Sequence, residues 1–247
     1  MVLGMAACDS SKKNDETTDN TTEQKIETTE TETIPAKGHK EVIDPAKDFV
    51  FQLSKTPSLW EDQMLDPKQC VLFSGGAAGA EQFFGAQAEA WGIEEVNYSF
   101  EGHQIERTRG VRVLTQDELA LKDVSMTYVS RLMGREYTRA PMFRKVLQSI
   151  CWQVSSGNEV IVIGEIQEDK TVKGGTGWGA EFAKLCNKPL LVFDQKQDAW
   201  FRWINDEWVK TTDPVIKHSR FTATGTRFLE ANGRRAIVEL YARSFNR

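Results

Sequence analysis

The chain has 247 residues, of which 40% are hydrophobic and 10% aromatic, enough for one sizeable core. No apolar run approaches the roughly 18–20 residues of a transmembrane helix. The net charge of −5, with an isoelectric point near 5.4, argues against nucleic acid as the main partner. The 4 cysteines and 3 histidines are scattered, so neither a disulfide scaffold nor a metal site is expected.

The first forty residues differ in composition from the rest. Residues 1–8 are apolar, end in small residues and Cys8, and resemble a truncated lipoprotein signal whose cysteine would be lipidated. Residues 9–40 are rich in threonine and glutamate and predict a disordered tether. A lipid anchor would place the protein at a membrane, facing the periplasm or the cell exterior. The alternative is an N-terminus that happens to contain a cysteine, on a cytoplasmic protein.

Residues 41–247 are expected to form one domain. A short strand at 70–73 precedes a glycine loop and a helix whose apolar residues recur at spacings of three and four. The segment EEVNYSF predicts a second strand. One long helix is expected next, with Thr115 as N-cap, Glu118 completing a capping box and Gly134 as its end.

The second half of the domain continues this alternation. A helix at 142–154 is followed by EVIVIGEI and PLLVFDQ, apolar runs typical of strands buried on both faces, with a helix at 180–186 between them. AWFRWINDEWVKT has period-2 aromatic residues and predicts a tryptophan-rich hairpin. A strand, RFTATG, and a helix close the chain. This order predicts an α/β, Rossmann-like three-layer sandwich with a mostly parallel sheet.

Glycine-rich turns follow three of the predicted strands and precede predicted helices. They are SGGAAGAE at 74–81, GGTGWGAE at 174–181 and TATGTR at 222–227. In a parallel sheet such turns meet at the carboxyl edge, where helix N-termini offer N–H groups to anions. Glycine lets the backbone approach a phosphate. The turns therefore predict a phosphate cradle, although none is a P-loop or a dinucleotide motif. Tight turns without a ligand are the alternative.

The candidate ligand-binding residues all belong to these turns. They are Ser74, Gly75, Gly76, Gly79, Gly174, Gly175, Thr176, Gly177, Trp178, Gly225, Thr226 and Arg227. Arg227 can hold a phosphate with two hydrogen bonds, and the hydroxyls of Thr226 and Ser74 can donate to the same anion. Trp178 can stack on a base, or else it packs in the core. An ordinary surface position is the alternative for Arg227.

The turns carry a resemblance to a known superfamily. GGTGWGAE resembles the GGxGTxxE signature of the lysine-decarboxylase-like, cytokinin-activating phosphoribohydrolases, with Trp178 in place of the threonine. VLFSGGAAGAE is similar to the earlier glycine loop of that superfamily, called SLOG, which includes DNA-processing protein A and molybdenum-cofactor carrier proteins. FTATGTR resembles its first strand and loop but comes last here. The resemblance, over about residues 68–247, therefore implies a circularly permuted Rossmann-like fold, similar to uncharacterised phage and bacterial proteins.

The resemblance implies binding of a nucleotide or a nucleotide-derived ligand. It also implies an alternative, an N-glycosidic hydrolase acting on a nucleoside monophosphate or an ADP-ribose-like substrate, with Glu181 as catalytic carboxylate. The family hydrolases use an arginine from the preceding helix; Arg144 is the nearest candidate, about two turns too early. Glu181 and Glu81 can instead be helix-start charges. Asp194 can bind a ribose hydroxyl or cap the segment that follows it.

The expected partner is a nucleotide-like small molecule. No cofactor, metal or nucleic acid is expected, a membrane enters only through a lipid on Cys8, and a homo-oligomer is compatible with the chain. Two further alternatives concern other partners. One is a non-catalytic interaction module, in which a partner would cover the tryptophans of the hairpin. The other is a DNA-processing role, which the acidic balance disfavours.

Overall fold

A computed structural model describes residues 65–137 and 140–245. The predictions for residues 1–8 and 9–40, and with them the lipidation of Cys8, lie outside these residues. Within the described ranges, none of the helices is both long and apolar enough to cross a bilayer.

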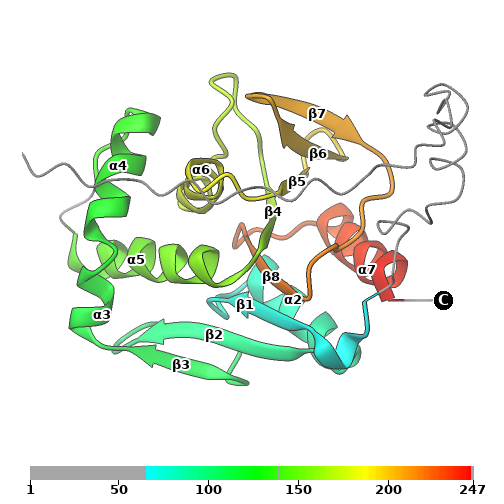
Figure 1. The fold of residues 1–247 in the computed structure, drawn as a ribbon, viewed down its shortest axis with the longest axis horizontal. Helices are drawn as coiled ribbons and strands as arrows, with labels where there is room; N and C mark the ends of the chain where they lie inside the picture. The colour runs from blue at the N-terminus through cyan, green and yellow to red at the C-terminus, as the bar shows by residue number, and fades with distance from the viewer. Residues whose placement is uncertain (1–64, 138–139, 246–247) are drawn as a thin grey trace, which may run out of the picture. The chain divides into compact units, whose positions relative to one another are not determined.

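The centre of the fold is an 8-stranded sheet with the strand order β3-β2-β1-β8-β4-β5-β6-β7 (Figure 1). In chain order the strands are β1 (Val71–Ser74), β2 (Glu94–Phe100), β3 (Val111–Leu114), β4 (Glu159–Gly164), β5 (Leu190–Asp194), β6 (Ala199–Ile204), β7 (Glu207–Thr211) and β8 (Arg220–Gly225). Neighbours from β3 to β5 pair in parallel, whereas β6 and β7 are antiparallel. The predicted α/β class with a mostly parallel sheet is confirmed.

Helices cover both faces of this sheet. They are α2 (Ala80–Ala90), α3 (Gln116–Ala120), α4 (Asp123–Met133), α5 (Pro141–Ser156), α6 (Thr176–Leu185) and α7 (Ala231–Phe245), and a short 3₁₀ turn, η1 (Pro67–Gln69), precedes β1. Helices α2 and α7 pack together on one face, and α4, α5 and α6 pack on the other (Figure 1). This arrangement is consistent with the Rossmann-like class expected from the sequence.

Strand β4 shows why the apolar runs are continuous. Every residue of β4 is buried. Ile161 and Ile163 belong to the core beneath α2 and α7, whereas Val160 and Val162 belong to the core beneath α4, α5 and α6. Because successive side chains of a strand point to opposite faces, a strand covered on both sides must be apolar throughout.

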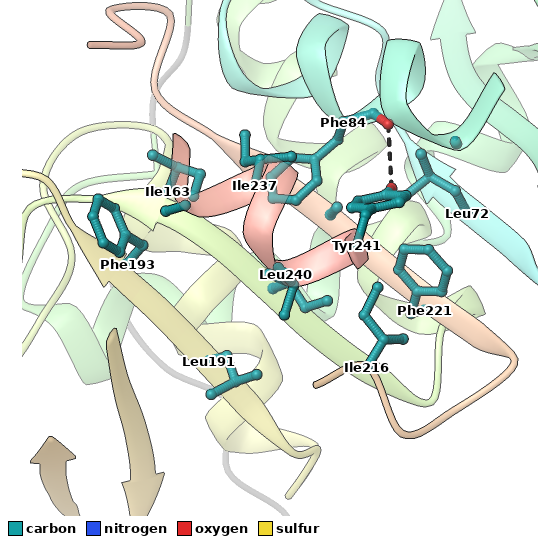
Figure 2. Close-up of a cluster of buried hydrophobic side chains, with 14 of the residues drawn as sticks. Leu72, Phe84, Ile163, Leu191, Phe193, Ile216, Phe221, Ile237, Leu240 and Tyr241 are labelled. Atoms are coloured by element: carbon teal, nitrogen blue, oxygen red, sulfur yellow. Dashed lines mark hydrogen bonds between the residues drawn. The ribbon is translucent and has the colours of Figure 1, made fainter. Parts of the chain in front are cut away.

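The core beneath α2 and α7 is built around Tyr241 (Figure 2). Its ring is fully buried and lies among Leu72, Phe221 and Leu240. The hydroxyl donates to the carbonyl oxygen of Phe84 at 3.2 Å, so the one polar atom of this side chain has a partner. Helix α7 is thereby fixed to both the sheet and α2.

The single helix expected after Thr115 is wrong, because the chain forms α3 and α4 instead. The capping box is present, with Glu118 N–H donating to Thr115 Oγ1 at 3.2 Å, and Gly134 ends α4 with a φ of 60°. In an unbroken helix the N–H of Lys122 would donate to the carbonyl of Glu118. That carbonyl instead accepts from Trp152 Nε1 at 2.9 Å, and Lys122 N–H donates to Leu119 at 3.0 Å.

Helix α6 begins four residues before the predicted start at 180. Thr176 is its first residue, so Gly177 and Trp178 are helical and do not belong to an open loop. The helix runs directly against the preceding loop, since a Cβ on Gly177 would fall on the carbonyl oxygen of Val172. Most of the second glycine motif is therefore the first turn and a half of a helix.

Candidate functional site

The three glycine turns meet at one cavity of about 1020 Å³. The strands that precede the first and third turns, β1 and β8, are parallel neighbours, and β4 lies next to β8. Their carboxyl ends therefore share one edge of the sheet. The first turn contributes Ala77, and Gly164 at the end of β4 also lines the cavity.

The structure divides the candidate residues into two groups. Gly174, Gly175, Thr176, Gly225, Thr226 and Arg227 line the cavity. The other candidates, which are not among the lining residues, are Ser74, Gly75, Gly76, Gly79, Gly177, Trp178 and Glu181. The cavity thus meets the beginning of the second turn and the end of the third, and it meets the first turn mainly through Ala77 and Glu81.

The first turn is joined to the third and uses its polar groups internally. The hydroxyl of Ser74 donates to the carbonyl oxygen of Ala223 in β8 at 2.8 Å. The N–H of Ala80 donates to the carbonyl oxygen of Thr226 at 3.0 Å. The hydroxyl of Ser74 is therefore committed to the sheet, and the two turns form one continuous wall of the cavity.

Glu81 lines the cavity and is only 6% exposed. Thr224 Oγ1 donates to it at 2.6 Å, the N–H of Ala77 donates at 3.1 Å, and the N–H of Gly75 also stabilises the carboxylate. Burial raises the pKa of Glu81 above its ordinary value, against the lowering effect of these hydrogen bonds and of the Arg227 charge. The N–H groups of the first turn thus already hold a carboxyl group that the chain itself supplies.

Helix α5 supplies the wall that faces the turns. Phe143, Val146 and Ile150 line the cavity together with the polar residues Ser149 and Gln153. Gln153 is 1% exposed, and its Oε1 has no hydrogen-bond partner among the described residues. A buried acceptor without a donor costs free energy, so this side chain needs a reason to be polar.

The amide of Gln153 stands next to the carboxyl of Glu81. A Cβ built on Gly75 would lie 2.5 Å from Gln153 Nε2 and 2.8 Å from Glu81 Oε2. Both groups therefore converge on the backbone of the first turn, and both line the cavity.

The second turn brings positive charge to the cavity. The N-terminus of α6 has Gly175 as N-cap, with no side-chain hydrogen bond to cap it. Lys173 and Lys196 line the cavity as well, and both pair with Glu165, at 2.8 Å and 3.7 Å. The helix N-terminus and the two ammonium groups favour an anion at this end.

Arg227 and His103 line the cavity beside the third turn. The ring of His103 stacks on Phe100 with centroids 4.4 Å apart. Burial, together with the charge of Arg227, lowers the pKa of His103 below its ordinary value. Phe228 follows Arg227 and is 84% exposed, which places a large apolar side chain at the edge of the cavity.

Two candidates of the second motif lie in the layer of α4, α5 and α6 instead. Trp178 is 4% exposed and packs 6.0 Å from the ring of Tyr137, so it takes the core position that was the alternative to base stacking. Glu181 pairs with Lys184 at 2.7 Å, and the Lys184 ammonium lies 3.8 Å from the ring of Trp203.

Two further residues weighed in the sequence use their side chains in contacts within the fold. Arg144 pairs with Asp123 at 2.9 Å. Asp194 is fully buried and accepts from the N–H groups of Lys196 at 2.8 Å and Gln197 at 2.9 Å, so it caps the segment that follows β5. Neither side chain is among those that line the cavity.

Sequence reasoning missed the contribution of α5. The available signal was Ser149 and Gln153, two polar residues four apart on a helix face otherwise occupied by Val146 and Ile150. Polar residues within an apolar stripe are the informative exceptions in a buried helix.

Fold and cavity together define an α/β protein with a ligand-sized cavity at the carboxyl edge of a mostly parallel sheet. Comparison of the chain with protein-family models, with curated proteins and with solved structures gives no significant match. The SLOG resemblance and the circular permutation stay predictions made from the motifs.

Proposed function

We propose that the protein binds a nucleotide or a nucleotide-derived ligand in this cavity. The observation that carries the proposal is that all three glycine turns reach a single cavity of about 1020 Å³ at the carboxyl ends of neighbouring parallel strands. A volume of this order accommodates a molecule with a base, a sugar and one or two phosphates.

The lining supplies the two kinds of contact that such a ligand needs. Arg227 in the third turn, Lys173 just before the second turn and Lys196 after β5 are cations that can neutralise a phosphate. Phe143 and Ile150 form an apolar surface on α5 against which a base can pack. The charge and the apolar surface belong to different elements, as expected for a ligand with one anionic and one aromatic part.

The order of the strands supports the proposed permutation. β8, the last strand in the chain, lies between β1 and β4 near the centre of the sheet. A segment that ends the sequence but occupies the middle of a parallel sheet is what a circularly permuted SLOG-type domain would have. The tryptophan-rich pair β6 and β7, where Trp203 lies opposite Trp208, would then be a peripheral addition.

The hydrolase alternative has no comparable support. Glu181, the carboxylate assigned to it by resemblance, is paired with Lys184 and is not a lining residue. Binding without an assigned reaction is therefore the function that the geometry favours.

The proposal is tested by native mass spectrometry of the full chain with AMP, ADP-ribose, NAD and cyclic nucleotides. We expect at least one to bind, with Arg227→Ala weakening its affinity by about tenfold or more, because a charge-assisted contact to phosphate is lost. Arg235→Ala is the matched control, since Arg235 pairs with Asp198 and is not a lining residue. Protein that binds none of these compounds would contradict the proposal.

A further inference from the structure

The cavity is lined by three basic residues besides His103 and by the carboxyl groups of Glu81, Glu165 and Glu230, and Glu165 pairs with both lysines. Arg227 comes from the third turn, Lys173 from just before the second turn and Lys196 from the segment after β5. Glu81 and Gln153, by contrast, converge on the first turn. The first turn therefore has the oxygens of Glu81 beside it, where its sequence suggests a phosphate, and the Nε2 of Gln153 lies next to them.

The reason is that Glu81 occupies the N–H groups of that turn. Ala77 and Gly75 donate to it, and Thr224 donates to its other oxygen. A phosphate placed there would have to displace a carboxylate that belongs to the fold.

Gln153, whose Nε2 lies at the same turn, adds a second acceptor through its Oε1. Its Oε1 is buried and has no partner among the described residues, although the side chain lines the cavity. A ligand hydroxyl or amino group is the kind of donor that would satisfy it. A buried amide oxygen without a partner in residues 65–137 and 140–245 is explained if it recognises such a donor.

We infer that Glu81 and Gln153 form an acceptor wall that binds a hydroxyl or amino donor of the ligand and excludes its phosphate. The inference rests on the proposed function and adds the orientation of the ligand to it. The nucleoside part, with its ribose hydroxyls or exocyclic amine, lies at the first turn. The anionic part lies at the second and third turns, near Arg227.

The test is Gln153→Leu in the full chain, with isothermal titration of AMP and of inorganic phosphate. Leucine has a similar size, and Gln153 Oε1 has no hydrogen-bond partner in the described part of the chain, so the substitution removes no described hydrogen bond to this oxygen. We expect the affinity for AMP to fall by roughly tenfold and the affinity for phosphate to stay unchanged. Gln148→Leu is the control, because Gln148 lies on the same helix but donates to Asp123.

A second variant and a set of analogues make the result decisive. Glu81→Gln should likewise weaken AMP more than phosphate. We expect the wild type to bind AMP more tightly than IMP, which lacks the amino donor, or than 2′-deoxy-AMP, which lacks a hydroxyl donor. In Gln153→Leu the preference over the analogue that lacks the donor bound by Gln153 should disappear, because the contact is lost whichever partner is removed. AMP bound equally well by wild type, Gln153→Leu and Glu81→Gln would overturn this inference alone. A wild type that binds neither phosphate nor AMP, ADP-ribose, NAD or a cyclic nucleotide would overturn the proposed function as well.

Discussion

The first and second glycine turns end in the same tripeptide, but the structure places the two glutamates in different surroundings. Both finish in Gly-Ala-Glu, at 79–81 and at 179–181. Glu81 is buried at the cavity, whereas Glu181 points to Lys184 beneath the tryptophans of β6 and β7. The same tripeptide therefore places one carboxylate in the candidate site and the other in a structural ion pair.

The difference comes from where each helix begins. Helix α2 starts at Ala80, so Glu81 is its second residue and can reach back to the turn. Helix α6 starts at Thr176, so Glu181 is already in its second turn and faces sideways. A motif match fixes residue types and spacing, but the start of the helix decides which way the side chains point.

The largest expected effect comes from a substitution in the first turn of α6. Gly177→Ala should destabilise the protein by about 3 kcal/mol or more, because its Cβ would fall on the carbonyl oxygen of Val172, which is backbone. Gly174→Ala is the matched control: its φ of 72° strains alanine, but no atom of the described residues lies within 4 Å of the added Cβ, so the cost should be about 1 kcal/mol. Urea unfolding measures both, and equal losses would contradict this account of the turn.

A second prediction concerns the pH dependence that Glu81 gives to stability. Its pKa in the folded state is raised above the ordinary 4.5, so between these two values the folded protein binds more protons than the unfolded chain. The free energy of unfolding should therefore fall as pH rises from about 4.5 through the raised pKa, relative to Glu81→Gln. Denaturant titrations of both proteins between these limits measure this difference. If the wild type instead gained stability relative to Glu81→Gln as the pH rises, the charged form of Glu81 would be stabilised in the folded protein, and this prediction would be wrong.

Much of the fold follows from local pattern. EEVNYSF was predicted and forms β2 over the same residues, and the capping box at Thr115 is present as expected. These succeed because periodicity and capping depend on residues close together in the chain. The break before α4 was missed because it depends on Trp152, which takes the carbonyl of Glu118 from 34 positions away.

In the candidate site, too, some features follow from local pattern and others depend on contacts between distant parts of the chain. The sequence places three turns at one edge of a sheet, because parallel strands align their carboxyl ends. It does not show that Glu81 would meet Thr224, which is 143 positions away, or that Gln153 would reach the first turn from α5. These contacts depend on how the helices and strands pack together, which the spacing of residues along the sequence does not reveal.

The smallest effect is expected at the other carboxylate of the compared pair. Glu181→Gln keeps an acceptor for Lys184, whose ammonium also contacts the ring of Trp203 and the carbonyl oxygen of Lys170. Because the side chains of Lys184 and Glu181 are only 10% and 12% exposed, we expect a loss of about 1–2 kcal/mol in the free energy of unfolding. AMP affinity should stay within about twofold of the wild type, in contrast to Glu81→Gln, because no described contact links this carboxylate to the cavity lining. If Glu181→Gln instead weakened AMP as much as Glu81→Gln, the two Gly-Ala-Glu endings would be equivalent in function, and the start of α6 would not explain their difference.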